Sequence, residues 1–145
     1  MLLVTGATSH TGKIFLKRLH NESYSRKIRC IVRKNSKVDW LKELNLKIEL
    51  FQGDLNNIES IAESFNNVDT VFNIAGIHFS LSLIQLGIRK NVEWFICVHT
   101  TGIYSKFKSA SNEYKNIENS ISKFSDLITI IRPTMIYGSE EDKNM

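Results

Sequence analysis

Two glycines near the start of the chain, Gly6 and Gly12, flank a turn that could bind a phosphate group. They bound the segment Thr5-Gly-Ala-Thr-Ser-His-Thr-Gly12, which follows a short apolar run and precedes a helical pattern. Gly6 lets the chain turn tightly as it leaves a strand, and Gly12 lets the next helix pack closely on the sheet. Free N–H groups at the start of that helix would face an anion. The segment therefore predicts a dinucleotide-binding turn with backbone amides around the pyrophosphate.

Ser9 separates this turn from the dehydrogenase fingerprint, which has a glycine two residues after the first and another three residues later. Here the spacing is Gly6-x-x-Ser9-x-x-Gly12. A side chain at Ser9 crowds the anion more than a hydrogen atom would, although its hydroxyl can donate a hydrogen bond to phosphate. An ordinary loop between a strand and a helix is the alternative interpretation of the turn.

A basic segment, Arg33-Lys-Asn-Ser-Lys37, follows the second apolar run of the chain. At this place, dinucleotide-binding folds that select NAD carry a carboxylate for the ribose hydroxyls, whereas the 2′-phosphate of NADP needs a cation. Arg33 offers a fork of donors to a phosphate, and Lys34 and Lys37 are close in sequence. The segment favours NADP(H), with NAD(H) possible, and a solvated basic loop is the alternative.

The elements that would position these residues follow from hydrophobic patterning. Short runs rich in Val, Ile, Leu and Phe suit parallel strands buried on both faces, and Trp40 and Trp94 are expected to fill the core. The expected strands are 2–5, 28–32, 47–51, 70–74, 94–98 and 127–131, and the expected helices are 11–21, 38–44, 58–65, 81–89 and 113–124. The fold class predicted is α/β, a doubly wound, mostly parallel six-stranded Rossmann sheet with helices on both faces.

Composition and length narrow the possible classes of protein. The 145 residues, 42% of them hydrophobic, suit a single domain over residues 1–145. No apolar run approaches the roughly 20 residues that span a bilayer. The first strand begins at Met1, which leaves no room for a signal peptide. Cys30 and Cys97 fall inside expected strands, so we expect a reduced, cytoplasmic protein without a membrane partner.

The charge pattern argues against nucleic acid as a partner. The net charge is +4, but the 19 basic and 15 acidic residues are well mixed, which is typical of a solvated surface. No cluster of cysteine and histidine has the spacing of a zinc site, so no metal is expected.

Four segments in order resemble the short-chain dehydrogenase/reductases. They are Thr5-Gly-Ala-Thr-Ser-His-Thr-Gly12, Gly53-Asp-Leu55, Asn73-Ile-Ala-Gly76 and Arg132-Pro-Thr-Met-Ile-Tyr-Gly138. The chain is most similar to the atypical and extended branches, which include epimerase/dehydratase-like and NmrA-like proteins, and the resemblance covers essentially the whole chain. It implies the NAD(P)(H)-binding domain of an oxidoreductase or epimerase-like protein. The alternative is a noncatalytic NADP(H)-sensing regulatory or interaction module of NmrA-like type.

The resemblance also implies which residues hold the cofactor. Asp54 matches an aspartate near the adenine amino group, with an N-cap or turn role as the alternative. Ala75 and Gly76 match small residues that let the backbone approach a cofactor ribose, or they form a simple tight turn. His10 lies over the cofactor or points to solvent. The implied set is Gly6, Thr8, Ser9, His10, Thr11, Gly12, Arg33, Asp54, Leu55, Ala75, Gly76 and Pro133.

For catalysis, the resemblance implies a Ser/Thr, Tyr and Lys constellation in which the tyrosine acts as acid or base and the lysine lowers its pKa. Thr100, in Val98-His-Thr-Thr-Gly-Ile-Tyr104, matches the hydroxyl residue. Tyr104 and Lys108 have the spacing Tyr-x-x-x-Lys.

Two alternatives to this catalytic pair stay open. Tyr114 with Lys115 is the first. The second is that the chain has no such pair, because Glu118 stands four residues after Tyr114, where the motif has lysine.

The C-terminal end bears on the substrate. In relatives, the segment matching residues 132–138 leads into a lobe that supplies most substrate contacts, and this chain ends at Met145, so that lobe is expected to be absent. If the protein is an enzyme, the resemblance implies a small carbonyl or sugar-type substrate. An apolar patch is expected near Pro133 to Tyr137, which could drive formation of a homo-oligomer.

Overall fold

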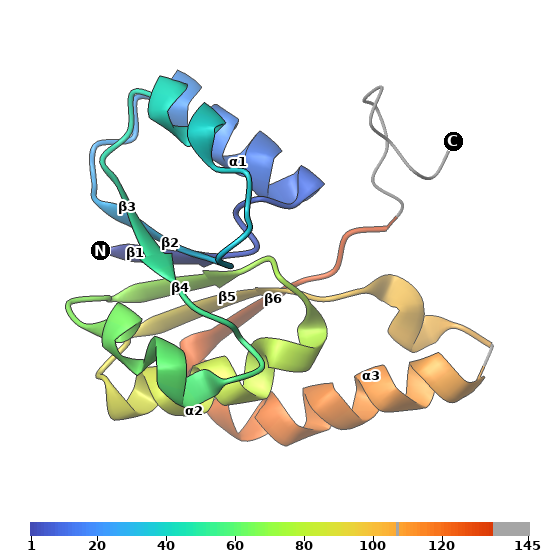
Figure 1. The fold of residues 1–145 in the computed structure, drawn as a ribbon. Helices are drawn as coiled ribbons and strands as arrows, with labels where there is room; N and C mark the ends of the chain where they lie inside the picture. Colours follow the sequence, from blue (N-terminus) through green and yellow to red (C-terminus); the bar gives the residue numbers. More distant parts are fainter. Residues whose placement is uncertain (107, 135–145) are drawn as a thin grey trace.

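Six parallel strands form one sheet in the order β3-β2-β1-β4-β5-β6 (Figure 1). The computed structural model describes residues 1–106 and 108–134. The strands are β1 (Leu2–Thr5), β2 (Ile28–Val32), β3 (Ile48–Gln52), β4 (Thr70–Asn73), β5 (Trp94–Val98) and β6 (Ile128–Ile131). Every pair is in parallel register, with Leu2 opposite Ile28 on one side and Thr70 on the other. The predicted doubly wound Rossmann sheet is confirmed.

Helices cover both faces of this sheet, as predicted. Figure 1 shows α1 on one face and α2 and α3 on the other. The α-helices are α1 (His10–Asn21), α2 (Ser80–Arg89) and α3 (Lys108–Ile121). Five 3₁₀ helices are η1 (Asp39–Glu43), η2 (Ile58–Phe65), η3 (Ile77–Phe79), η4 (Thr101–Tyr104) and η5 (Ser122–Leu127).

Three expected helices differ in type or by more than one residue in extent, whereas α1 and α2 each begin one residue earlier than expected. Residues 38–44 and 58–65 were expected as helices, and they form the 3₁₀ helices η1 and η2, a geometry that proteins use for short connections. The last helix was expected over 113–124. It begins earlier, at Lys108, and its α-helical part ends at Ile121, beyond which η5 contains a kink at Phe124.

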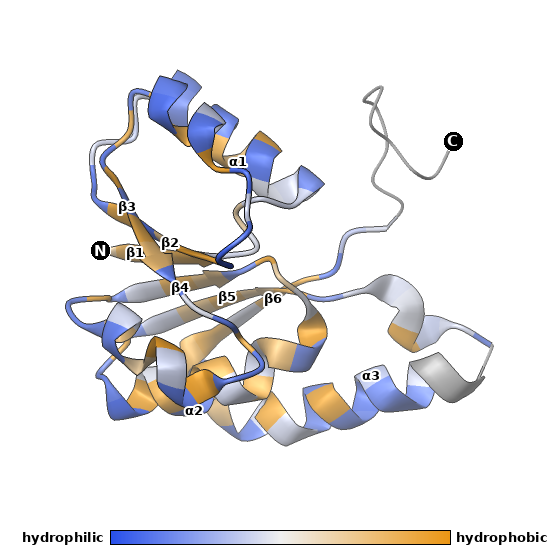
Figure 2. Ribbon diagram, viewed as in Figure 1, coloured by the Kyte–Doolittle hydropathy of each residue, from blue (hydrophilic) through white to orange (hydrophobic). Residues whose placement is uncertain are grey.

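Side-chain alternation along the central strands builds one core on each face. Leu2 and Val4 of β1 pack in a cluster with Leu16 of α1, whereas Leu3 packs on the other face with Phe65 and Phe95. All of these side chains are buried. Figure 2 shows the same division, with hydrophobic strands between helices that turn polar surfaces outward. Successive side chains of a strand point to opposite faces of the sheet. Both faces of the central strands are covered, so these strands are apolar at nearly every position.

Burial on both faces holds for the central strands and was wrong for the outer part of the sheet. Leu50 of the edge strand β3 is 43% exposed, and Ile131 of the opposite edge strand β6 is 43% exposed. Trp94 was expected in the core but is 47% exposed, and its indole N–H donates a hydrogen bond to Thr129 at 3.0 Å. Leu50 and Ile131 lie on edge strands, which have a neighbour on one side only and lack part of the cover that central strands receive. Trp94 lies on β5, an inner strand, and is the first residue of that strand.

The strand order reverses between β1 and β4. From β1 the chain moves outward to β2 and β3, and then returns to β4 on the other side of β1. In open α/β sheets a crevice forms at the carboxyl ends of the strands where the direction reverses. The loops after β1 and β4 therefore lie side by side at this edge.

Candidate functional site

The loop after β1 is held against the turn after β4 by a glycine at each close approach. Gly6 has φ +70°, and a Cβ added there would lie 2.7 Å from the backbone nitrogen of Ala75. A Cβ added at Gly12 would lie 2.2 Å from the carbonyl oxygen of Gly6. Both contacts are too short for any side chain. The glycines therefore have the roles expected from the sequence, a tight turn at Gly6 and close packing of α1 at Gly12.

Ser9 is the N-cap of α1. Its hydroxyl oxygen accepts a hydrogen bond from the backbone N–H of Gly12 at 3.1 Å, and its carbonyl accepts one from Lys13 at 2.9 Å. The cap takes up one of the N–H groups that the sequence alone left free for an anion. The hydroxyl hydrogen of Ser9 is still available for donation.

A pocket of about 320 Å³ lies at the carboxyl ends of β1 to β4. The predicted cofactor residues on its walls are Gly6, Thr8, Ser9, Arg33, Asp54, Leu55 and Ala75. The remaining wall residues are Ile31, Val32, Ser36, Gly53, Asn56 and Phe79. Five predicted residues, His10, Thr11, Gly12, Gly76 and Pro133, do not line this pocket.

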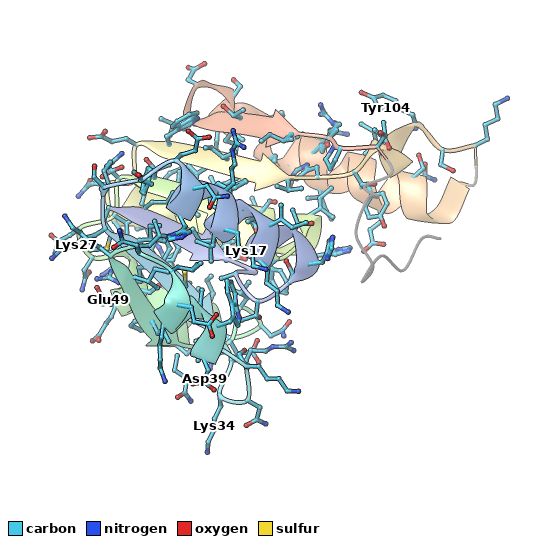
Figure 3. All side chains as sticks on the ribbon, turned by 90° about the horizontal axis from the view of Figure 1, so that it is seen from above. Lys17, Lys27, Lys34, Asp39, Glu49 and Tyr104 are labelled. Atoms are coloured by element: carbon cyan, nitrogen blue, oxygen red, sulfur yellow. The ribbon has the colours of Figure 1, made fainter. Side chains whose placement is uncertain are left out.

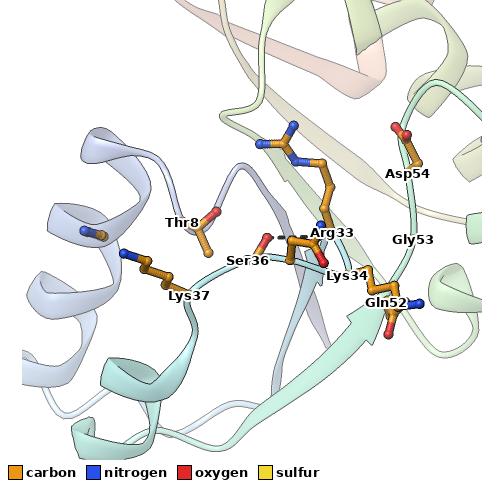
Figure 4. A pocket seen from close by; sticks show the side chains of 10 residues that line it. Thr8, Arg33, Lys34, Ser36, Lys37, Gln52, Gly53 and Asp54 are labelled. Atoms are coloured by element: carbon orange, nitrogen blue, oxygen red, sulfur yellow. Dashed lines mark hydrogen bonds between the residues drawn. The ribbon is translucent and has the colours of Figure 1, made fainter.

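A second, more open pocket of about 770 Å³ adjoins the first and is rich in basic side chains (Figure 4). Arg33 extends between Thr8 and Asp54, and Lys37 extends toward α1. The backbone N–H of Arg33 donates to the hydroxyl of Ser36 at 3.1 Å, which closes the turn after β2. The cationic wall residues are Lys13, Arg33, Lys34 and Lys37. No salt bridge occupies any of these four cations within the described residues.

Asp54 lines both pockets and also forms a turn. Its carboxylate accepts hydrogen bonds from the backbone N–H of Asn56 at 2.9 Å and from the side-chain amide of Asn56 at 3.0 Å. The N-cap of η2 is Asn57. The turn role that was the alternative for Asp54 is therefore present, and the carboxylate also faces the pocket.

The turn after β4 depends on one glycine and on a buried asparagine. Gly76 has φ +143°, and a Cβ added there would meet no atom within 4 Å, so glycine is needed for its backbone conformation. The side-chain amide of Asn73 donates to the carbonyl of Gly76 at 2.9 Å. The backbone N–H of Ala75 donates to the hydroxyl of Thr5 at 3.4 Å. Open space beside Gly76 leaves room for a ligand to approach the backbone.

Thr100 and Tyr104 lie at the two ends of the short helix η4, beyond β5. Thr100 is its N-cap, and its hydroxyl accepts a hydrogen bond from the backbone N–H of Gly102 at 3.0 Å. Tyr104 is 71% exposed, and Figure 3 shows it on the β5–β6 side of the molecule, with Lys34 on the β3 side. Lys108 begins α3 after an extended residue at Ser105, so Tyr104 and Lys108 do not share a helical face. The side chain of Lys108 lies outside the described residues.

Tyr114 is the tyrosine that approaches Thr100. A Cβ added at Gly102 would lie 3.1 Å from the Tyr114 ring and 3.2 Å from the Thr100 hydroxyl oxygen, so both groups border the same glycine. The ring of His78 lies 6.1 Å from the ring of Tyr114. Lys115 follows Tyr114 directly and points from a different side of α3, because neighbouring helical residues do not face each other.

A buried group that the sequence analysis did not identify as a site lies behind Thr100. His99 is 5% exposed and contacts both Ser80 and Glu118. Burial lowers the pKa of His99 below its usual value, and the hydrogen bond with Glu118 offsets part of that effect. Burial alone would raise the pKa of Glu118, but hydrogen bonds from Arg132 and His99 outweigh it and hold that pKa below its usual range. The absence of lysine at position 118 was the only signal in the sequence.

Among the described residues, neither a membrane-spanning helix nor a cluster of metal ligands is found. No helix among them has the length and apolar character needed to cross a membrane. Nor do they contain a group of three or more histidine, cysteine, aspartate or glutamate side chains that could hold a metal ion.

The sequence was compared with known protein families. A family described as NAD(P)H-binding matches residues 6–144. The chain belongs to this NAD(P)H-binding family. No curated protein sequence matches the chain with significance.

Solved structures with the same fold include members that carry NADP. Triphenylmethane reductase of Citrobacter sp., complexed with NADP(H), matches with a TM-score of 0.76 and 21% identity over 94% of this chain and 50% of its own. A short-chain dehydrogenase/reductase of Veillonella parvula in complex with NADP has a TM-score of 0.74 and 17% identity, covering 97% of this chain and 71% of its own. An NADPH-dependent quinone oxidoreductase of Escherichia coli has a TM-score of 0.72 and 16% identity, covering 92% and 47%. This NAD(P)H-binding chain thus spans about half the length of several neighbours.

The pocket at the carboxyl ends of the strands has the features that a dinucleotide requires. Because residue 6 is glycine, it places no side-chain atom between the loop after β1 and the turn at Ala75, where a Cβ would lie 2.7 Å from the backbone nitrogen of Ala75. Backbone at the start of α1 borders the pocket through Thr8 and Ser9, and the cation of Arg33 stands at its far wall. A pyrophosphate needs backbone donors and a 2′-phosphate needs a cation. The residues present therefore fit the cofactor.

Proposed function

We propose that this chain binds NADP(H) in preference to NAD(H) and serves an oxidoreductase or epimerase-like protein of the short-chain dehydrogenase/reductase type. The observation that carries the proposal is the position of Arg33, which follows β2 and lines both pockets beside Ser36. A guanidinium at that place can bind a 2′-phosphate with two parallel hydrogen bonds. Lys13 and Lys37 line the more open pocket and add positive charge there. The carboxylate of Asp54 lines the same pocket and accepts hydrogen bonds from Asn56.

The proposed cofactor residues divide by role. Backbone around Gly6, Thr8 and Ser9 would hold the pyrophosphate, and Asp54 with Leu55 would border the adenine. Ala75 and Gly76 would let the second ribose approach. His10, Thr11 and Pro133 belong to the proposal through the resemblance alone. Gly12 would act through packing, because it supports Gly6 and does not line the pocket.

When bound, NADPH would supply a hydride to a carbonyl carbon of a small carbonyl or sugar-type substrate. The chain would have to hold the substrate and deliver a proton to its oxygen. Thr100 with Tyr114 is the pair best placed for this step, because both border Gly102. Tyr104 with Lys108 is the other candidate pair. A tyrosine hydroxyl is a suitable general acid for such a transfer.

The first experiment is a calorimetric titration of the chain with NADPH and then with NADH at one salt concentration. NADPH-selective binding is the expected result, since the basic wall discriminates the 2′-phosphate. Binding of neither cofactor would overturn the proposal.

Turnover is tested by following NADPH absorbance with a panel of small aldehydes, ketones and oxidised sugars. Replacing Tyr114 by Phe should lower any turnover by about 10²-fold, the scale of a lost general acid, while Tyr104→Phe should leave it within about twofold. The reverse ranking would assign the proton transfer to Tyr104 and reject Tyr114.

A noncatalytic NADP(H)-sensing module is the second candidate function. Glu118 favours it, because its carboxylate is paired with Arg132 and His99 at the helical position where the catalytic motif has lysine. This candidate expects tight NADPH binding and no turnover with any carbonyl substrate. Detectable turnover that Tyr114→Phe abolishes would exclude it.

Location and assembly belong to the same proposal. Cys30 and Cys97 are buried free thiols, as expected of a protein in the reducing cytoplasm. The apolar patch expected at residues 133–137 lies mostly outside the described residues, so formation of a homo-oligomer rests on the sequence. Cell fractionation and light scattering are the direct measurements.

A further inference from the structure

A continuous chain of buried hydrogen bonds runs from the cofactor pocket to α3. At its near end, the hydroxyl of Thr5 accepts from the backbone N–H of Ala75 at 3.4 Å and donates to the side-chain oxygen of Asn73 at 2.7 Å. The side-chain amide of Asn73 then donates to Ser80 at 3.2 Å. Thr5, Asn73 and Ser80 are each 0% exposed. No water is needed to connect the pocket to α2.

The far end of this chain reaches two charged side chains. The hydroxyl of Ser80 lies 2.9 Å from Nε2 of His99, and Nδ1 of His99 lies 3.0 Å from Oε1 of Glu118. Arg132 donates two hydrogen bonds to the same carboxylate, from Nε to Oε1 at 3.0 Å and from Nη2 to Oε2 at 2.6 Å. α2, the segment after β5, α3 and the segment after β6 each contribute one member.

Only one tautomer of His99 satisfies all of these contacts. Hydrogen bonds from Arg132 and His99 keep the pKa of Glu118 below its usual range, and an ionised carboxylate can only accept, so Nδ1 of the neutral His99 ring must be the donor to Glu118. Nε2 is therefore the acceptor, and Nδ1 carries the hydrogen that is donated to Glu118. Arg132 holds that carboxylate in place, which fixes the ring of His99. No buried side-chain nitrogen or oxygen of the described residues is left without a partner.

The near end of the chain sets the position of the turn that lines the pocket. Asn73 can hold the carbonyl of Gly76 at 2.9 Å only while its amide keeps this orientation, and Ser80 is the acceptor for the second amide hydrogen. Gly6 packs against Ala75 so closely that a displaced turn would meet the loop after β1. Hydrogen bonds and packing thus connect His99, through Ser80 and Asn73, to both loops of the pocket.

We propose that Ser80, His99 and Glu118 are positioning residues for the cofactor, which keep the Ala75–Gly76 turn in its binding position through one fixed tautomer of His99. The inference rests on the proposed NADP(H) binding and adds residues that do not line the pocket. It also predicts a dependence on pH. Protonation of His99 turns Nε2 into a donor, so the hydroxyl hydrogen of Ser80 loses this acceptor and has to turn to another group, which alters the hydrogen bonds at that point.

The groups that face His99 are few and chemically distinct. Glu118 of α3 and Arg132 lie on its Nδ1 side, and Ser80 of α2 lies on its Nε2 side. Cys97 of β5, two residues before His99, is neutral over the working range because burial raises the pKa of its thiol to about 11. His99 is thus the member of the group that gains a charge as the pH falls, and burial places its pKa below the usual value for histidine.

The experiment compares two buried serines. Ser80→Ala removes the link between Asn73 and His99, whereas Ser64→Ala removes a buried hydroxyl, also 0% exposed, that donates only to the carbonyl of Ile61 within η2. Both variants should lose similar thermal stability. We expect Ser80→Ala to weaken NADPH binding by about three- to tenfold and Ser64→Ala by less than about twofold, on the scale of one hydrogen bond. Equal affinities in the two variants would overturn the inference.

Two replacements of His99 test the tautomer. The amide oxygen of His99→Gln can reach the place of Nε2 and accept from Ser80, whereas His99→Asn reaches the place of Nδ1 and leaves Ser80 without an acceptor. NADPH affinity near neutral pH should stay within about twofold of wild type in the glutamine variant and fall about three- to tenfold in the asparagine variant. Equal losses in both would contradict a role for Nε2.

Binding measured against pH gives a readout that a purely structural role would not move. As the pH falls through the lowered pKa of His99, wild-type affinity for NADPH should fall by more than the affinity of His99→Gln. The titration of the cofactor phosphate is common to both proteins and cancels in the comparison. Parallel pH profiles would overturn the switch. A wild-type chain that binds neither NADPH nor NADH would overturn the proposed function itself, whereas wild-type binding with unchanged variants would overturn only this inference.

Discussion

Arg33 is the single residue on which the preference for NADP(H) depends. Its side chain is exposed, forms no salt bridge within the described residues, and lines both pockets. Its backbone N–H is tied to Ser36, so the turn that carries it is ordered by its own hydrogen bond. A guanidinium in this state is available to a phosphate ligand without breaking an existing interaction.

Replacing Arg33 by Ala should lower the affinity for NADPH by about tenfold and the affinity for NADH by less than about twofold, because only NADPH carries the 2′-phosphate. Calorimetric titration with both cofactors measures the difference. Arg89→Ala is the matched control, since Arg89 is also exposed and pairs with Glu59 away from the pocket. Equal loss of both cofactors in Arg33→Ala would reject the assignment of Arg33 to the 2′-phosphate.

At the scale of elements, the joint between β1 and α1 combines stability with binding. Gly12 packs α1 on the loop after β1, and Ser9 caps the same helix. The helix therefore cannot move away from the sheet without moving the backbone that borders the pocket. Gly87 makes a comparable approach elsewhere, because a Cβ there would meet the ring of Phe95 at 2.5 Å. The two glycines allow packing and binding to be separated.

Gly12→Ala and Gly87→Ala should both lower the free energy of unfolding, by about 1–3 kcal/mol, because each adds a methyl group to a filled contact. Only Gly12→Ala should also weaken NADPH binding, since its methyl group displaces Gly6. Chemical denaturation and calorimetry on the same samples measure both effects. If Gly12→Ala bound NADPH like Gly87→Ala, the loop after β1 would not be the pyrophosphate site.

At the scale of the whole molecule, the order of the strands brings together residues that are far apart in sequence. The pocket lies where the strand order reverses between β1 and β4. The neighbouring strands β4, β5 and β6 then bring their carboxyl ends into one row beside it. Asn73 ends β4, His99 follows β5 and Arg132 follows β6. One buried polar chain therefore joins the pocket to the far half of the sheet.

This arrangement makes the stability of the whole chain sensitive to acid. The pKa of His99 is lowered in the folded state, so the unfolded chain takes up the proton at higher pH. The contribution of His99 is complete above its unfolded pKa of about 6.5 and is lost as the pH falls through the folded value. As the pH falls through the lowered pKa of His99, the melting temperature of wild type should therefore drop by roughly a few degrees more than that of His99→Gln.

The control for this measurement is His78→Gln, because His78 is exposed and contacts Glu113 at the surface. Its melting temperature should follow wild type across the range. If His99→Gln and wild type lost stability in parallel, burial of the neutral imidazole would not be what makes the fold sensitive to acid.

The sequence by itself determined the strands, the turn at Gly6 and Gly12, and the placement of Arg33 after β2. These features are local: the period of two, the run of apolar residues and the glycine spacing are all contained within a few neighbouring residues. The segments 2–5, 28–32 and 94–98 were predicted with the observed bounds. The restriction to one domain and the absence of a C-terminal lobe stay predictions.

Only the tertiary structure decided which strands are at the edges and which polar side chains meet. Leu50 and Trp94 are of residue types that are typical of a core, and their exposure follows from where they lie in the sheet. The contacts of His99 with Ser80 and Glu118 span 19 residues in each direction. No local pattern encodes such pairs, because strand order and helix placement bring their members together.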